Sequence, residues 1–171
     1  MWSAENLHTV LAAILSGVLI CVAVGDVMNR RIPNAAVLAV VALFALWALA
    51  DRGASLGAGL AAAAIGFGVG FVFYLMRIMG AGDVKLFAAV ALFTGLSYLH
   101  LFALATVLAG GVMAVLTLAA RPRRALVMFT LKGRGDYGRG IPYGVAIAVG
   151  GLIAVWGGLT GALPVDVLNR I

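Results

Sequence analysis

Long apolar stretches alternate with short groups of charged residues along the whole chain. The stretches without Asp, Glu, Lys or Arg cover residues 6–25, 32–50, 53–76, 86–120 and 140–165. A helix rises 1.5 Å per residue, so about 20 apolar residues cross a hydrocarbon core about 30 Å thick. Four of these stretches fit a single crossing. The stretch 86–120 is long enough for two crossings, because its length corresponds to roughly 52 Å of helix.

The natural break in this longest stretch lies between Gly95 and His100. Gly95 and Ser97 are turn residues, and Tyr98 is an aromatic residue of the kind that collects at the membrane interface. The pattern therefore predicts an all-α integral membrane protein, a single-domain bundle of six transmembrane helices over residues 1–171. The predicted helices cover residues 8–26, 35–50, 54–76, 84–96, 100–119 and 141–161.

The composition strengthens the membrane interpretation and removes several other classes. Hydrophobic residues make up 64% of the 171 residues and charged residues 11%, against about 45–50% and 25% in soluble domains. A water-soluble domain, a disordered chain and a disulfide scaffold are therefore excluded. Cys21 is the only cysteine, so the sequence offers no cysteine-rich zinc site. With His8 and His100 both predicted on the outer side, we expect neither a metal nor another cofactor.

The basic residues predict the orientation. Ten of the 12 Lys and Arg residues follow the first, third and fifth predicted helices, whereas Arg52 and Arg170 lie on the other side. Basic loops stay in the cytoplasm, so we predict a multi-pass protein of the inner (plasma) membrane with both termini outside. The basic loop 120–140 is predicted to be a cytoplasmic anchoring loop, with an interfacial helix as the alternative. Since the net charge of +6 arises in loops between apolar runs, we expect no nucleic-acid partner.

Asp26 ends the first predicted helix on the cytoplasmic side. A turn at Pro33 follows it, and Asn34 is placed to cap the second helix. Taken alone, Asp26 has a structural interpretation as a boundary carboxylate that pairs with Arg30.

Asp83 ends the segment Gly80-Ala81-Gly82-Asp83, directly ahead of the fourth predicted helix. Its structural interpretation is the N-cap residue of that helix. The preceding turn, however, carries no strongly polar side chain from Ile78 to Gly82, so we predict that it dips below the headgroups. A carboxylate at that depth costs about 2.5–3.5 kcal/mol on insertion scales and is a functional candidate by default.

A third pattern, Gly140-Ile141-Pro142-Tyr143-Gly144, opens the last predicted helix. Proline is common in the first turn of a helix. The glycines on both sides of Pro142 and Tyr143 predict a stretch of bare backbone along which an extended peptide can lie.

In series, these three patterns resemble those of the prepilin peptidase family. These type IV leader peptidases are GxGD-type membrane aspartyl proteases, and the chain is similar to the short forms of tight-adherence pilus systems. The resemblance implies that Asp26 and Asp83 are catalytic and activate water to remove the leader peptide at the cytoplasmic face. It also implies a partner, a prepilin with a basic leader followed by an apolar helix. Residues expected to bind substrate or support the site are Gly80, Gly82, Lys85, Pro33, Asn34, Pro142, Tyr143 and Gly144.

The chemistry of such a pair is clear from first principles. Two nearby carboxyl groups share one proton, because both cannot ionise cheaply, and they then supply a base and an acid together. Lys85 is two residues from Asp83, so on a regular helix it faces away and either snorkels to the interface or steadies the site.

Two other function classes stay open at this stage. One is a non-catalytic membrane subunit of a pilus or secretion assembly, in which the acidic residues are structural. The other is a small proton-coupled transporter, which needs polar groups that continue toward the outer face. The interiors of the second, fourth, fifth and sixth predicted helices offer almost none.

Overall fold

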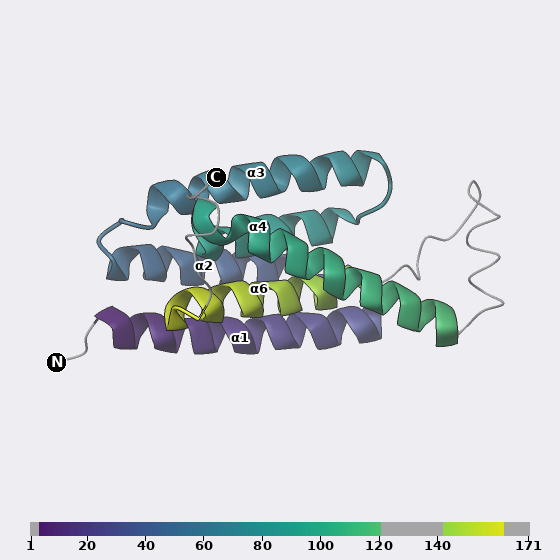
Figure 1. Ribbon diagram of the computed structural model, residues 1–171, viewed down its shortest axis with the longest axis horizontal. Helices are drawn as coiled ribbons and strands as arrows, with labels where there is room; N and C mark the ends of the chain where they lie inside the picture. The colour runs from purple at the N-terminus through teal and green to yellow at the C-terminus, as the bar shows by residue number, and fades with distance from the viewer. Residues whose placement is uncertain (1–3, 121–141, 163–171) are drawn as a thin grey trace.

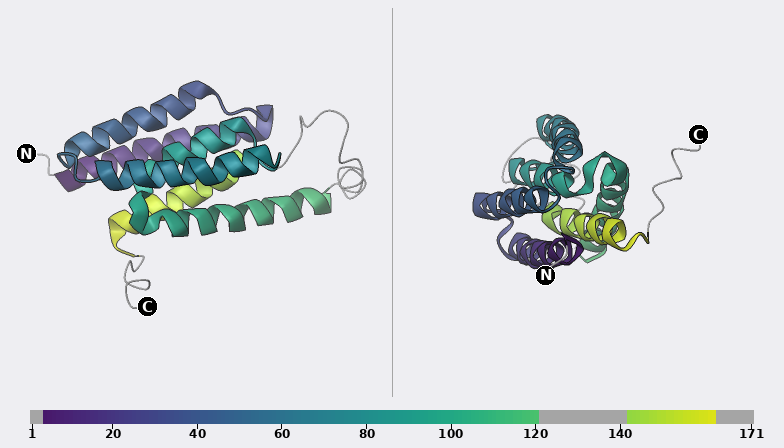
Figure 2. Two further views of the ribbon diagram at one scale, coloured as in Figure 1. Left: turned by 90° about the horizontal axis from the view of Figure 1, so that it is seen from above. Right: turned by 90° about the vertical axis from the view of Figure 1, so that its left-hand side faces the viewer.

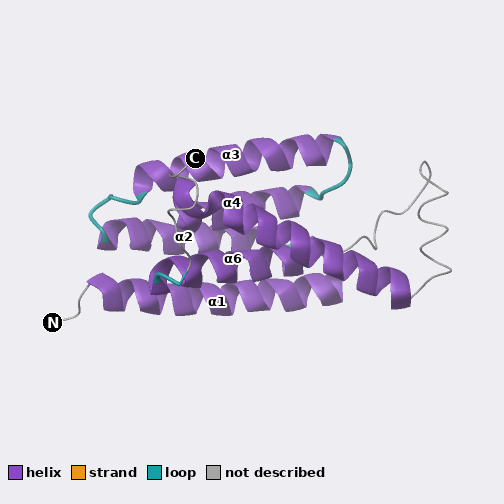
Figure 3. Ribbon diagram, viewed as in Figure 1, coloured by secondary structure: helices purple, strands orange, loops and turns teal. Residues whose placement is uncertain are grey.

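The computed structural model describes residues 4–120 and 142–162, and in these residues the chain forms helices and no strand (Figure 3). The predicted all-helical class is therefore confirmed for this part of the chain. Most of the predicted basic loop, from residue 121 onward, lies outside the described residues. The helices are α1 (Ala4–Asn29), α2 (Asn34–Ala50), α3 (Leu56–Leu75), α4 (Ala81–Ala120) and α6 (Tyr143–Thr160).

The helices run up and down along one long axis (Figure 1). The chain turns from α1 into α2 and from α3 into α4 at the same end of the molecule, on the right in Figure 1. Helix α4 packs against α2, α3 and α6, and α1 packs against α2 and α6. The end-on view shows the resulting bundle (Figure 2).

A kink at Gly95 divides α4 into two helical stretches. Gly95 has a φ of 55° and a ψ of −172°, a conformation that glycine adopts without the clash of a side chain. The chain reverses direction there, and the second stretch runs back along the bundle and extends past its end (Figure 1). The sequence predicted a break over residues 95–100. The structure confines it to Gly95, because Ser97 and Tyr98 are already helical.

The helices are apolar on their outer faces as well as inside. Segments long and apolar enough to cross a membrane are Asn6–Asn29, Leu56–Leu75, Ala81–Leu116 and Tyr143–Thr160, and α2 is a shorter apolar helix. Large apolar side chains point outward, for example Leu38, which is 67% exposed. Such a surface requires lipid around it, so the protein is a multi-pass membrane protein.

The core lies where α1, α4 and α6 meet. Leu15 and Leu19 of α1, Phe102 of α4 and Ile147 of α6 are almost completely buried. A hydrogen bond also joins two of these helices, since Trp156 Nε1 donates a bond of 3.0 Å to Ser16 Oγ. A polar side chain among helices in lipid needs such a partner, and this bond fixes α6 against α1.

We predict that Gly95→Ala lowers the thermal unfolding temperature in detergent. The added Cβ atom has room, because its nearest neighbour is Ala58 Cβ at 3.6 Å. The backbone strain of about 1–3 kcal/mol remains. The matched control is Gly68→Ala in α3, where a Cβ atom meets nothing within 4 Å and alanine favours the helix. Equal unfolding temperatures for the two variants would show that Gly95 imposes no backbone constraint.

Candidate active site

Three segments that are far apart in the sequence meet at one end of the bundle. They are the last turn of α1, the first turn of α4 and the first turn of α6, at the right of Figure 1. The contacts between them bring Asp26 and Asp83 into one region.

Asp26 lies in the last turn of α1 and is only 5% exposed. Its Oδ2 atom accepts a hydrogen bond of 2.8 Å from the backbone N–H of Gly144. This N–H belongs to the first turn of α6, where backbone donors have no partner within the helix. The carboxyl group therefore joins α1 to the start of α6 and satisfies a donor that lipid cannot satisfy.

Only glycine fits at position 144, because a side chain there would collide with Asp26. A Cβ atom there would lie 2.8 Å from Asp26 Oδ2 and 3.0 Å from Asp26 Cβ. The prediction of bare backbone open to a peptide is therefore wrong at Gly144, because Asp26 already covers that surface. Gly140 and Ile141, the start of the same predicted stretch, lie outside the described residues.

Asp83 lies in the first turn of α4. Its Oδ2 atom accepts a hydrogen bond of 3.1 Å from the backbone N–H of Gly80. Helix α4 begins at Ala81, not at residue 84 as the sequence predicted. Asp83 is thus the third helical residue, and Gly80 is the N-cap. The Asp83 carboxylate reaches back to the Gly80 N–H, as an acidic residue does in a capping box. The interpretation of Asp83 as the N-cap residue is therefore wrong. The contact leaves Asp83 partly exposed.

The two carboxyl groups are close enough to interact electrostatically. The charge of Asp26 acts on Asp83, and the charge of Asp83 acts in turn on the Tyr143 hydroxyl. The charge of Arg30, just beyond the end of α1, also acts on Asp26. One acid is thus buried and the other partly exposed, and each has an oxygen held by a glycine N–H.

The segment between α1 and α2 supports the Asp83 turn. A Cβ atom on Gly82 would lie 3.3 Å from Ile32 Cβ, so the absence of a side chain lets the two segments approach closely. Lys85 Nζ donates a hydrogen bond of 3.4 Å to Asn34 Oδ1. Pro33 occupies the N-cap of α2, and no side chain caps this helix. The prediction that Asn34 caps it is therefore wrong, and Asn34 connects α2 to α4 instead.

Pro142 and Tyr143 complete the region. Pro142 is the N-cap of α6 and is buried, whereas Tyr143 is partly buried and its ring lies near Gly110 of α4. Among the described residues no three His, Cys, Asp or Glu side chains are grouped as metal ligands. His8 stacks on Trp47 near the start of α1, with 4.4 Å between the ring centroids.

A family model described as the type IV leader peptidase family matches residues 13–115, more than half of the 171 residues. The chain belongs to the type IV leader peptidase family. The matched region of this leader peptidase contains Asp26 and Asp83 and ends before Gly144. Membership makes the chain a membrane peptidase of the prepilin-processing class. No curated protein matches the chain, and no solved structure does.

Sequence reasoning did not assign two features of the leader peptidase site. One is the pairing of Asp26 with Gly144, which are separated by 118 positions, although both belong to the motifs that carried the resemblance. The other is the packing of Ile32 against the Asp83 turn. The only sign of it in the sequence was the position of Ile32 beside Pro33 and Asn34. Its role depends on a contact with Gly82, and such a contact exists only once the helices are packed.

We predict that Gly144→Ala reduces prepilin cleavage by about 10²-fold. The added methyl group overlaps with Asp26, and a displacement of about 1 Å in an active site has that effect on rate. The control is Gly111→Ala in α4, where the added Cβ atom meets nothing within 4 Å. The measurement is the rate of cleavage of a co-expressed prepilin at equal amounts of each variant. Wild-type rates for Gly144→Ala would mean that the position of Asp26 does not matter.

Proposed function

We propose that this leader peptidase is an aspartyl endopeptidase that removes leader peptides from type IV prepilin-like substrates at the cytoplasmic face of the inner membrane. Asp26 and Asp83 activate the water. The observation that carries the proposal is that these two carboxyl groups, which come from α1 and α4, lie at the same end of the bundle, near enough for the charge of Asp26 to act on Asp83. Both residues lie in the part of the chain that matches the family.

Hydrolysis of a peptide bond needs a base for water and an acid for the amide. In the proposed reaction, one ionised carboxylate takes a proton from water as the water oxygen bonds to the carbonyl carbon. The other carboxyl group donates its proton to the carbonyl oxygen. The C–N bond then breaks as the leaving nitrogen receives a proton from one carboxyl group, while a hydroxyl of the tetrahedral intermediate gives its proton to the other, which restores the shared proton. The hydrogen bonds from Gly144 and Gly80 limit the rotation of the two carboxyl groups, which favours a fixed geometry for both transfers.

The remaining residues of the region have supporting roles in this proposal. Gly80 holds Asp83 by a hydrogen bond, and Gly82 lets Ile32 pack beside it. Asn34, held after the turn at Pro33, and Lys85 connect α2 to α4. A second set, Pro142, Tyr143 and Gly144, lies at the start of α6, where the Gly144 N–H holds Asp26.

The charge distribution supports the proposed orientation. Among the Lys and Arg residues that the structure describes, Arg30, Arg31, Arg77 and Lys85 lie near the end with the two aspartates, and Arg52 follows the far end of α2. Basic residues stay in the cytoplasm, so the catalytic end faces that side. We further propose six crossings with both termini outside, in which the two stretches of α4 each cross once.

We predict that Asp26→Asn and Asp83→Asn each reduce prepilin cleavage by about 10²–10⁴-fold, the contribution typical of general acid–base groups. The double variant is expected to lose little more than either single variant, because residues that act as one unit are not additive. The measurement is cleavage of a co-expressed prepilin, with membrane levels of each variant checked.

Asp51→Asn is the matched control. Asp51 accepts hydrogen bonds from Gly53 and Ser55 in the loop after α2, at the opposite end of the bundle from the proposed site, so cleavage is expected to persist. Wild-type cleavage by Asp26→Asn or Asp83→Asn would defeat the proposal and favour a non-catalytic role in pilus assembly.

We also predict a cleavage rate that passes through a maximum as pH changes. At low pH both carboxyl groups carry protons and no base remains, and at high pH neither carries one and no acid remains. The measurement is initial rate against pH in liposomes with purified prepilin. A rate that is independent of pH across the range in which the fold is intact would contradict a shared proton.

A further inference from the structure

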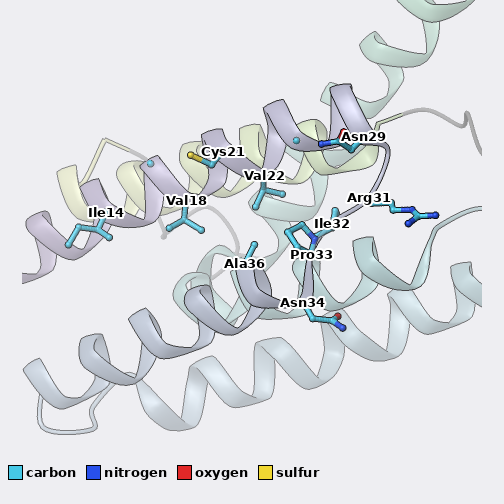
Figure 4. Close-up of a pocket in the computed structure, with 12 residues that line it drawn as sticks. Ile14, Val18, Cys21, Val22, Asn29, Arg31, Ile32, Pro33, Asn34 and Ala36 are labelled. Carbon is cyan, nitrogen blue, oxygen red and sulfur yellow. The ribbon is translucent and has the colours of Figure 1, made fainter.

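A groove of about 840 Å³ lies between α1 and α2 (Figure 4). Its volume is in the range of ligand pockets, about 300–1,000 Å³. Ile14, Val18 and Val22 line its apolar length on α1, while Arg31 and Asn34 lie at its polar end. That end is formed by the segment that joins α1 to α2.

The α1 side of the groove has small residues at every fourth position, Gly17, Cys21 and Gly25. A Cβ atom on Gly17 or Gly25 would meet nothing within 4 Å. Small residues at this spacing let the backbone of another helix approach closely in lipid. The groove therefore offers a surface of the kind that helices pack on, and within residues 4–120 and 142–162 no further helix lies against Gly17 or Gly25.

Helix α3 shows what fills such a surface in this protein. Gly66 and Gly70 have the same spacing as Gly17 and Cys21, but a Cβ atom on either would contact a side chain of α4. These side chains are Phe87, at 3.2 Å from the added atom on Gly66, and Val84, at 3.0 Å from that on Gly70. Gly66 and Gly70 thus form a helix–helix contact between α3 and α4. The open face of α1 has a suitable shape for a second contact of this kind.

The polar end of the groove lies beside the segments that carry the two aspartates, although neither carboxyl group lines the groove itself. Gly25 lines the groove and directly precedes Asp26. Ile32 also lines it and packs against Gly82, the neighbour of Asp83. From Ile14 to Asn29 the groove follows α1 for roughly 22 Å, most of the thickness of the hydrocarbon core.

We propose that the groove between α1 and α2 seats the apolar helix of the prepilin substrate, an inference that rests on the proposed function. The helix lies against Gly17, Cys21 and Gly25, and its cytoplasmic end unwinds where the groove meets the catalytic end. Unwound backbone needs hydrogen-bond partners, and Asn29 and Arg31 at the polar end carry donors. A lipid chain also fits apolar space, but it gains nothing from glycines at helical spacing.

Cys21 provides a direct test, because it is the only cysteine in the chain, is exposed and lines the groove. Prepilins with one cysteine at successive positions of the apolar helix are oxidised in membranes with the Asp83→Asn peptidase, which keeps the substrate uncut. Disulfide adducts are expected at positions three or four residues apart, on one helix face. They are expected to disappear with Cys21→Ser.

Gly17→Leu tests the same groove without cysteine chemistry. The larger side chain fills open space in the groove, so we expect at least a tenfold rise in KM for prepilin with a smaller change in kcat. Gly68→Leu is the matched control, since Gly68 also faces open space but lies on α3. This control is expected to leave both parameters at wild-type values.

The outcomes separate the groove from the proposed function. If wild-type protein cleaves prepilin but no position forms an adduct and Gly17→Leu retains its KM, the groove is not the docking site and the peptidase proposal stands. If phospholipid co-purifies with wild type and is lost in Gly17→Leu, again without adducts, the groove binds lipid and the inference is overturned. If adducts form on one helix face but wild-type protein does not cleave, docking stands and the proposed function fails.

Discussion

The hydrogen bond from Gly144 to Asp26 is the constraint on which the rest of the site depends. A carboxyl group at a helix end in lipid has to find a donor, and an N–H group in the first turn of a helix has to find an acceptor. Each of these two groups satisfies the other at 2.8 Å. The contact fixes the last turn of α1 against the start of α6, and α4 then brings Asp83 to the same place.

Some of the side-chain hydrogen bonds in the described helices connect different elements. Trp156 and Ser16 join α6 to α1 in the membrane interior, whereas Lys85 and Asn34 join α4 to α2 near the site. Between them the helices pack through apolar side chains and glycines. Because lipid is as apolar as the helix surfaces, close packing and these few bonds, rather than exclusion of water, hold such a bundle together.

The sequence predicted much of this arrangement, because membrane helices are set by length and hydropathy. It placed the break in the longest apolar stretch near Gly95 and put Asp26 and Asp83 in one region. It did not place Asp83 inside the first turn of α4, since residues without charge or strong polarity give no boundary signal there. Nor did it predict that Asp26 covers Gly144, or that a groove lies beside Gly17. These features arise from packing between helices, which periodicity along one helix does not encode.

Helix α6 carries the N–H group that holds Asp26. The matched region ends at residue 115, so it includes both acids and omits the helix whose first turn holds Asp26. A polypeptide that ends after α4 would keep both Asp26 and Asp83. The nearly buried Asp26 would then lack the Gly144 N–H that donates a hydrogen bond to it. Evolution at the start of α6 is therefore constrained by Asp26. A substitution at Gly144 that adds even one carbon requires a compensating shift in α1.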